Sequence, residues 1–243
     1  MEREHITPQG VSVFHDKNEN IHSFCLCLYV RAGSLFETKE NNGISHFFEH
    51  IVFKNIHYQM GENLYQTLDR CGLDFNASTY EEFIQFIITG APAHFEEAAE
   101  ILTGIFEPIT LPEEVIDTER KRIKAEIREE DEESSLAYFT KKIAWKNTSL
   151  ERTITGKKKT LDKIKGKQLR KFQKEVLSSN NIFFYISGNY PETAVVTVTK
   201  LMENYPLTVM KKERKNLAPV PKHFFARKPK VYVKNSKKTC VCF

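Results

Sequence analysis

The 243-residue sequence has no long hydrophobic run, because its longest apolar stretch is the seven residues from Phe24 to Val30. A membrane-spanning helix needs about 18 to 20 apolar residues, so we expect a chain that does not enter a membrane. The first residues, Met1 to His5, include acidic side chains and lack the apolar segment of a secretory signal peptide. We therefore expect a cytoplasmic protein.

Cysteine is also scarce, with five residues and no C-x-x-C pair. An odd number of cysteines fits a reducing compartment better than a framework of disulfides. Two C-x-C pairs occur in strand-like sequence, Cys25 with Cys27 and Cys240 with Cys242, and residues two apart in a strand share one face. Four such thiols could hold a structural zinc ion. We favour the more common use of cysteine, as a small apolar residue on a buried strand face.

The net charge of +4 conceals an uneven distribution along the chain. Residues 1–140 contain 11 basic and 26 acidic residues, a net charge of −15, whereas residues 141–243 contain 25 and 6, a net charge of +19. The basic half is mostly lysine and lacks the interleaved arginine and aromatic residues of a base-stacking surface. We therefore interpret it as a solvated surface and expect no nucleic-acid partner.

The pattern of apolar residues predicts an α+β fold with a largely antiparallel sheet. Strands are expected within residues 10–30 and at 73–78, 82–89 and 181–187. Helices are expected at 43–53, 62–70, 93–106, 112–133, 135–147, 168–178 and 192–204. We expect one domain over residues 1–210, a lysine- and proline-containing linker over 211–230, and a terminal strand or the start of a second module over 231–243.

The most informative motif lies in the helix that begins near Gly43. His46 and His50 are one helical turn apart, Glu49 lies beside them, and all three fall on the face opposite the apolar stripe. Histidines at positions i and i+4 can direct their ring nitrogens at one zinc ion, about 2.0–2.1 Å from each. A neighbouring glutamate can take a proton from a metal-bound water. The spacing therefore favours a zinc site over a solvated polar helix face.

A catalytic zinc site needs a third protein ligand and one open position. The helix that follows Pro112 offers three carboxylates on the same stripe as its apolar residues: Glu119, Glu126 and Glu130. A carboxylate in such a place is costly unless it is paired or bound to a metal. The helical positions alone leave all three residues open as the third ligand.

The motif and its surroundings resemble the H-x-x-E-H signature of the inverzincins, the family of pitrilysin, insulin-degrading enzyme and mitochondrial processing peptidase. The resemblance covers about residues 7–206. The segments that carry it are Arg31 to Thr38, Asn42 to Lys54, Asn76 to Thr79, Ile154 to Gly156, Asn181 and Ile186 to Gly188. Asn55 departs from the family pattern, because a glycine is common at this position.

The resemblance implies a zinc-dependent endopeptidase, of which this chain is the catalytic module. The family places its third zinc ligand 76 residues after the second histidine, which here is Glu126. A further important glutamate lies seven residues earlier and matches Glu119. Glu49 is the implied general base. The strand that contains Asn76, Ala77 and Ser78 is implied to bind an extended peptide substrate by strand addition.

The resemblance also implies an incomplete chamber. Family enzymes pair two modules of this size, each with helices packed on one side of its sheet, and they close over the peptide. The second module supplies an arginine and a tyrosine that help to bind the substrate. We therefore expect a second module or subunit as a partner, in a hetero- or homo-oligomer. The alternative is a non-catalytic or incomplete subunit that binds zinc and peptide without turnover.

Overall fold

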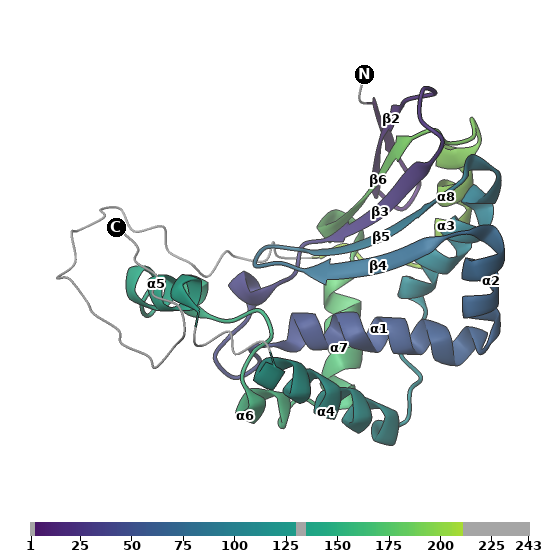
Figure 1. The fold of residues 1–243 in the computed structure, drawn as a ribbon. Coiled ribbons are helices and arrows are strands. Elements are labelled where there is room, and N and C mark those ends of the chain that lie inside the picture. The colour runs from purple at the N-terminus through teal and green to yellow at the C-terminus, as the bar shows by residue number, and fades with distance from the viewer. Residues whose placement is uncertain (1–2, 130–134, 211–243) are drawn as a thin grey trace.

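A computed structural model describes residues 3–129 and 135–210, which form a six-stranded sheet with helices packed against it (Figure 1). The strands lie in the order β1-β2-β6-β3-β5-β4. Neighbouring strands are antiparallel, except that β2 and β6 run parallel. The predicted α+β fold with a largely antiparallel sheet is therefore confirmed. The strands are β1 (Arg3–Ile6), β2 (Ser12–Lys17), β3 (Phe24–Val30), β4 (Asp74–Thr79), β5 (Ile84–Gly90) and β6 (Ile182–Gly188).

The central strands alternate between buried and partly exposed residues, which is the pattern of a sheet with one covered face. Their register brings Leu26 of β3 opposite Ile88 of β5 and Ile186 of β6. All three side chains are fully buried. This row of aliphatic side chains forms part of the core between the sheet and the helices.

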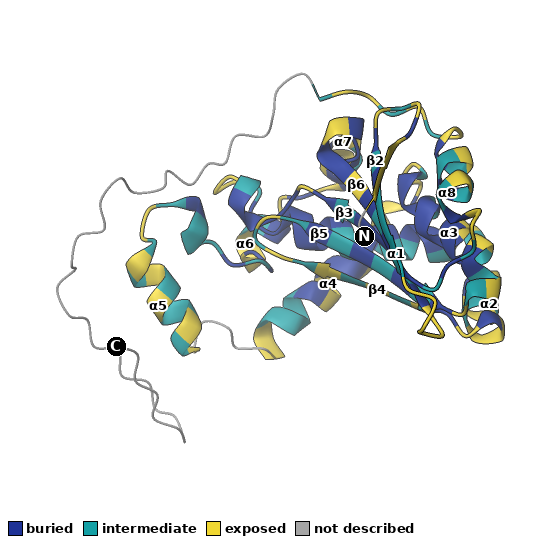
Figure 2. Cartoon of the chain, turned by 90° about the horizontal axis from the view of Figure 1, so that it is seen from above, coloured by how far each residue is buried: buried dark blue, intermediate teal, exposed yellow. Residues whose placement is uncertain are grey.

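The helices lie on one side of the sheet, as Figure 1 shows, so the expected one-sided packing is confirmed. In Figure 2 the buried residues concentrate where the sheet and the neighbouring helices meet, whereas α5 has none. The helices are α1 (Ile44–Met60), α2 (Asn63–Cys71), α3 (Phe95–Thr103), α4 (Glu113–Glu129), α5 (Leu136–Ala144), α6 (Lys158–Leu161), α7 (Gly166–Val176) and α8 (Ala194–Met202).

A buried arginine fixes α4 on the side of α1 that faces away from the sheet (Figure 1). Arg120 is 6% exposed and donates hydrogen bonds to the carbonyl oxygens of Leu161, at 3.0 Å, and Ile164, at 2.7 Å. Its guanidinium carbon lies 5.5 Å from the ring centroid of Phe47 in α1. A buried charge is tolerated when it is hydrogen-bonded in this way, and this residue therefore sets how α4 lies against α1.

Several predicted elements differ from those observed. α1 continues to Met60 where we expected an end near Phe53, because buried Ile56 extends its apolar face. The helix expected at 93–106 is α-helical only over Phe95–Thr103 and has a short 3-10 helix at each end. β1 and α6 were not predicted, and all four residues of β1 are exposed. The expected linker and terminal strand, 211–243, lie outside the described residues.

Asn55, the residue that departs from the family pattern, is buried and makes hydrogen bonds at both ends of its amide. Its Oδ1 accepts from the backbone N–H of Thr110 at 3.0 Å, and its Nδ2 donates to the carbonyl oxygen of Pro108 at 3.1 Å. The asparagine at this position therefore connects the second half of α1 to the segment before α4.

Within residues 3–129 and 135–210, no helix has both the length and the hydrophobicity needed to cross a membrane.

Candidate metal centre

α1 and α4 bring two histidines and one glutamate together. Nε2 of His46 lies 3.6 Å from one carboxylate oxygen of Glu126, and Nε2 of His50 lies 3.6 Å from the other. One donor atom from each of the three residues lies within 4.8 Å of the others. The carboxylate of Glu126 therefore faces both imidazole rings at once.

The state of His46 suits a metal ligand. The residue is 8% exposed, although we expected it on the polar face of its helix, because α4 packs across this face. Burial, together with the neighbouring His50, lowers the pKa of His46 to about 3. The ring is therefore neutral at pH 7, and its buried Nδ1 has no hydrogen-bond partner. Two imidazoles and one carboxylate are a donor set that fits Zn²⁺ with one open position.

Glu119 contacts the opposite side of the His50 ring. Its Oε2 lies 3.4 Å from Nδ1 of His50, and its Oε1 lies 3.4 Å from Nζ of Lys54. Burial acts to raise the pKa of Glu119, but the hydrogen bond from His50 and the charges of Lys54 and Arg122 outweigh it, so the pKa lies below its ordinary value. Glu119 thus holds His50 in place while Glu126 faces Nε2. The third candidate, Glu130, lies outside the described residues.

Glu49 lies between the histidines and the edge of the sheet. Its carboxylate accepts a hydrogen bond from the hydroxyl of Thr79, the last residue of β4. Burial raises the pKa of Glu49, although this hydrogen bond and the charge of His50 oppose the effect. Sequence reasoning did not single out Thr79 for this contact, which only the packing of β4 beside α1 creates.

β4 is an edge strand and pairs with β5, so its other edge is free of a described strand. The predicted substrate-binding residues lie in its middle, where Asn76 and Ser78 are exposed and Ala77 is partly buried. Nδ2 of Asn76 donates a hydrogen bond to Asp74 on the same face, at 2.9 Å. The backbone groups of this edge are therefore available to a further strand, next to the residue that contacts Glu49.

A buried carboxylate from outside the helix holds the start of α1. Glu37 is 2% exposed and accepts hydrogen bonds from the backbone N–H groups of Gly43, at 2.8 Å, and Ser45, at 2.9 Å. It also accepts from Nδ2 of Asn42 at 2.9 Å. Burial raises the pKa of Glu37, and these hydrogen bonds counteract the shift. Glu37 thus replaces the missing side-chain cap of Gly43, a role that sequence reasoning missed.

Two glycines allow the chain to cross itself beside this helix start. Gly43 has a φ of 96° and Gly156 a φ of 77°, both in the region that favours glycine. A Cβ atom on Gly43 would lie 2.8 Å from the carbonyl oxygen of Thr155 and 2.9 Å from Cα of Gly156. The crossing therefore requires glycine on both segments, and it fixes the first turn that carries His46.

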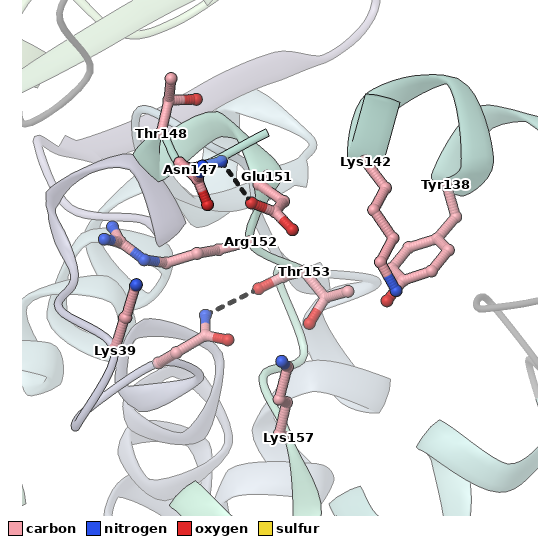
Figure 3. A pocket seen from close by; sticks show the side chains of 10 residues that line it. Lys39, Tyr138, Lys142, Asn147, Thr148, Glu151, Arg152, Thr153 and Lys157 are labelled. Atoms are coloured by element: carbon pink, nitrogen blue, oxygen red, sulfur yellow. Dashed lines mark hydrogen bonds between the residues drawn. The ribbon is translucent and has the colours of Figure 1, made fainter. Parts of the chain in front are cut away.

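A cationic pocket of about 300 Å³ lies next to this crossing (Figure 3). Its lining includes four basic side chains and one carboxylate, those of Lys39, Lys142, Arg152, Lys157 and Glu151. Arg152 also donates a hydrogen bond to the carbonyl oxygen of Glu37. We expected the basic second half of the chain to form a solvated surface. Three of its basic residues, Lys142, Arg152 and Lys157, also line this pocket beside the start of α1.

The described residues do not support the alternative zinc site at the C-x-C pairs. Sγ of Cys25 and Sγ of Cys27 lie 3.4 Å apart on the sheet. Within the described residues, no third metal-ligating group joins them. Cys240 and Cys242 lie outside the described residues.

A comparison with protein-family models matches residues 12–158 to "Insulinase (Peptidase family M16)". The chain belongs to this family. The match confirms the resemblance that the H-x-x-E-H motif suggested. It covers both histidines, Glu49, Glu119 and Glu126, as well as the edge strand.

Curated relatives include zinc proteases and processing peptidases. The "Uncharacterized zinc protease YmxG" of Bacillus subtilis is 27% identical over 198 residues, which cover 81% of this chain and 48% of the relative. The β subunit of mitochondrial-processing peptidase from Rattus norvegicus is 31% identical over 155 residues, covering 63% of this chain and 32% of the subunit. The chain thus spans about half or less of the length of these relatives.

Solved structures show the same fold. The periplasmic protease PqqL from Escherichia coli aligns with a TM-score of 0.81 at 21% identity, over 91% of this chain and 26% of that protein. A peptidase M16 inactive domain from Pseudomonas fluorescens aligns with a TM-score of 0.75 at 14% identity, over 87% of this chain and 53% of the other. The fold is therefore that of one half of an M16 peptidase.

Proposed function

We propose that this chain is the zinc-binding catalytic module of a metalloendopeptidase, in which His46, His50 and Glu126 hold the metal. The observation that carries the proposal is the position of the Glu126 carboxylate, with each oxygen 3.6 Å from Nε2 of one histidine. A zinc ion held there would supply a Lewis acid that polarises the scissile carbonyl and lowers the pKa of a bound water molecule. The names of the zinc-protease relatives support this choice of metal.

The remaining roles follow from the neighbours of each carboxylate. Glu49 shares the polar face of α1 with both histidines and has a raised pKa, so it can accept a proton from water and release it to the leaving amine. Glu119 keeps the His50 ring oriented through Nδ1. Thr79 holds the Glu49 carboxylate toward the edge of the sheet.

The open edge of β4 supports an extended peptide as the substrate. A peptide that pairs with Asn76, Ala77 and Ser78 would extend the sheet by one strand through backbone hydrogen bonds. Because β4 ends at Thr79, which contacts Glu49, such a peptide would pass beside the proposed general base. Because such pairing uses backbone groups, peptides of different side-chain sequence could bind this edge.

The second candidate is a subunit that binds zinc and peptide without turnover. It is consistent with the fold, which this chain shares with a peptidase M16 inactive domain from Pseudomonas fluorescens. In both candidates we propose a second module or subunit as the partner. The cytoplasmic location and the boundary at residue 210 stay predictions.

Metal analysis of variants tests the ligand set. We expect His46→Ala, His50→Ala and Glu126→Ala each to remove one equivalent of zinc. Glu119→Gln should weaken zinc affinity by only about 10- to 100-fold, because it acts through His50. Glu129→Gln is the matched control, since this exposed glutamate lies on the same helix and is not among the ion-pair partners of the histidines.

Two results would overturn this ligand set. Zinc retained in full by Glu126→Ala but lost in Glu130→Ala would move the third ligand to Glu130. Zinc content at the full wild-type level in all three ligand variants would remove the site altogether. Peptide hydrolysis by the wild-type chain with a second module, compared with the same mixture containing Glu126→Ala, then separates the catalytic module from the non-catalytic subunit.

A further inference from the structure

A second group of metal-ligating side chains lies where α2 ends and α3 begins. Cys71 is the last residue of α2, His94 is the N-cap of α3, and Glu97 lies in the first turn of α3. One sulfur, one ring nitrogen and one carboxylate oxygen from these residues all lie within 4.8 Å of one another. Over residues 3–129 and 135–210, the only other such group is that of His46, His50 and Glu126.

The donor atoms of this second group include a buried nitrogen that has no hydrogen bond. Nδ1 of His94 is closed off from solvent and unpartnered, and the nearest carboxylate oxygen, Oε1 of Glu97, is 3.5 Å away. The Cys71 side chain is also buried, with the residue 5% exposed. A buried polar atom without a partner is destabilising, and a cation held by the three side chains would remove this cost.

The backbone around the three residues is well fixed. α2 ends at Gly72, whose φ is 59°, and the backbone N–H of Leu73 donates to the carbonyl oxygen of Leu68 at 2.8 Å. On the other side, the backbone N–H of His94 donates to the carbonyl oxygen of Ala91 at 3.0 Å. The next residue, Phe95, is buried against Phe24 of the sheet, with ring centroids 4.9 Å apart. His94 and Glu97 are three residues apart, a spacing that puts two side chains on one helix face.

We propose that Cys71, His94 and Glu97 bind one Zn²⁺ ion, with a water molecule as the fourth ligand. Cys71 would bind as the thiolate and release its proton to solvent. A thiolate and an imidazole select a zinc-like ion over Mg²⁺ or Ca²⁺. Bond lengths of about 2.0–2.3 Å set donor atoms about 3.5 Å apart in a tetrahedron, so the widest pair closes by about 1 Å, which rotation of the partly exposed His94 and Glu97 side chains allows.

An ion bound at this site would link two helix ends. It joins the end of α2 to the start of α3, two elements that are otherwise connected in the chain through the β4–β5 hairpin. It shares no residue with the proposed catalytic centre, so it does not depend on the proposed function. A bound ion would also stabilise the folded chain, because the unfolded chain does not hold the three donors together.

Cobalt(II) titration of the metal-free full chain tests the proposal separately from the catalytic centre. A cysteine thiolate bound to Co²⁺ produces an intense near-ultraviolet charge-transfer band, whereas histidine and carboxylate ligands do not. We expect this band in the wild-type chain, its displacement by Zn²⁺, and its loss in Cys71→Ser. His94→Gln, which keeps every thiol, should weaken Co²⁺ binding measured by this band at least tenfold.

Controls assign the band to this site. Cys25→Ser and His22→Gln, which alter a thiol of the C-x-C pair and an exposed histidine, should leave the band unchanged. His46→Ala should also leave it unchanged while removing the metal of the catalytic centre, so the two sites succeed or fail independently. A band that survives Cys71→Ser, or no band in the wild-type chain, would overturn the proposal. If Cys71→Ser does not fold, the proposal would be overturned by a Co²⁺ affinity of His94→Gln that equals the wild-type affinity.

Discussion

Glu49, Glu119 and Glu126 project from facing sides of α1 and α4, but each carboxylate has a different neighbour. Glu126 faces two imidazole nitrogens, Glu119 binds the far side of one ring, and Glu49 accepts a hydrogen bond from Thr79. Burial raises the pKa of Glu49, whereas hydrogen bonding and nearby cations hold the pKa of Glu119 low. The three glutamates therefore differ in their contacts, and Glu49 and Glu119 also differ in the direction of their pKa shifts, because their surroundings differ.

Replacing Glu49 by glutamine separates the general base from the metal ligands. Glu49→Gln keeps the size of the side chain but cannot accept a proton, so we expect turnover by the active assembly to fall by about 10²- to 10⁴-fold. Zinc content, measured by elemental analysis, should stay at the wild-type level. Glu129→Gln should match the wild-type chain in both measurements. Wild-type turnover in Glu49→Gln would remove Glu49 from the mechanism.

The thiol of Cys25 offers a pH-dependent test on the sheet. The hydrogen bond from Cys27 lowers the pKa of Cys25 to about 7, although burial opposes it. Alkylation of Cys25, followed by peptide mass spectrometry, should therefore accelerate as the pH rises through about 7, because the thiolate is the nucleophile. Cys27→Ala should move this midpoint upward toward the ordinary value of 9.0, and Cys71→Ser should not. An unchanged midpoint in Cys27→Ala would contradict the assignment.

At the scale of secondary-structure elements, α1 depends on residues that lie outside it. Its N-cap is a glycine, and its first N–H groups are bound by Glu37 and shielded by the crossing of Gly43 over Gly156. Arg120 of α4 packs on its other side, over Phe47. The orientation of His46 and His50, the proposed zinc ligands on α1, is therefore set by three separate parts of the chain.

Removal of the Glu37 carboxylate should loosen the start of α1. Glu37→Ala leaves two backbone N–H groups and the Asn42 amide without their acceptor, and each hydrogen bond to a charged group contributes about 1.5–3 kcal/mol. Because burying the Glu37 carboxylate itself costs free energy, the net loss is smaller than the sum of these hydrogen bonds, and we expect the free energy of unfolding in urea to fall by at least about 3 kcal/mol. Glu40→Gln, in the exposed part of the same loop, should change it by less than about 0.5 kcal/mol. Equal stability of the two variants would show that Glu37 does not cap α1.

The glycine crossing can be tested with a matched pair of substitutions. Gly156→Ala combines a strained φ of 77° with a Cβ only 2.6 Å from Cα of Gly43. Gly61→Ala has a similar φ of 60° but open space around the new methyl group. Positive φ alone costs about 1–2 kcal/mol, so urea denaturation should show that loss for Gly61→Ala and a clearly larger one for Gly156→Ala. A loss no larger in Gly156→Ala would mean that the crossing relaxes freely.

Over the whole of the described structure, helices cover one side of a single sheet whose β4 edge is open. The proposed metal centre lies beside this edge. Efficient peptide hydrolysis also requires donors placed to meet the developing oxyanion, each worth about 10²–10³ in rate. The family pattern places such groups in a second module.

We therefore expect residues 1–243 alone to bind zinc but to cleave peptides at least about 100-fold more slowly than a mixture with a second module. The measurement is a fluorogenic peptide assay on fractions whose mass is fixed by light scattering. Because the chain has an acidic half and a basic half, the gain in rate should diminish as salt screens the docking. Full activity from a strict monomer would contradict this prediction, whereas activity only in a self-associated dimer would show that a second copy completes the site.

The sequence alone determined the features that depend on local periodicity. Strand-length runs rich in apolar residues predicted β3, β5 and β6, and in β5 and β6 the covered face of the sheet buries every second side chain. The i, i+4 spacing placed His46 and His50 together on one face of a helix, because that face follows from 3.6 residues per turn. These properties need no knowledge of what packs against each element.

The way in which the elements meet depends on contacts between distant parts of the chain. β1 carries no alternation because all its residues are exposed, and β2 pairs with β6 across about 170 residues of chain. Helical positions alone left Glu119, Glu126 and Glu130 open as partners of the histidines. The packing of α4 on α1 turns Glu126 toward Nε2 of both His46 and His50. The same packing turns Glu119 toward Nδ1 of His50. Local sequence determines which residues lie on the same face of one helix. The rotation of α4 relative to α1 depends instead on side chains that pack between the helices, such as Arg120, which lies over Phe47.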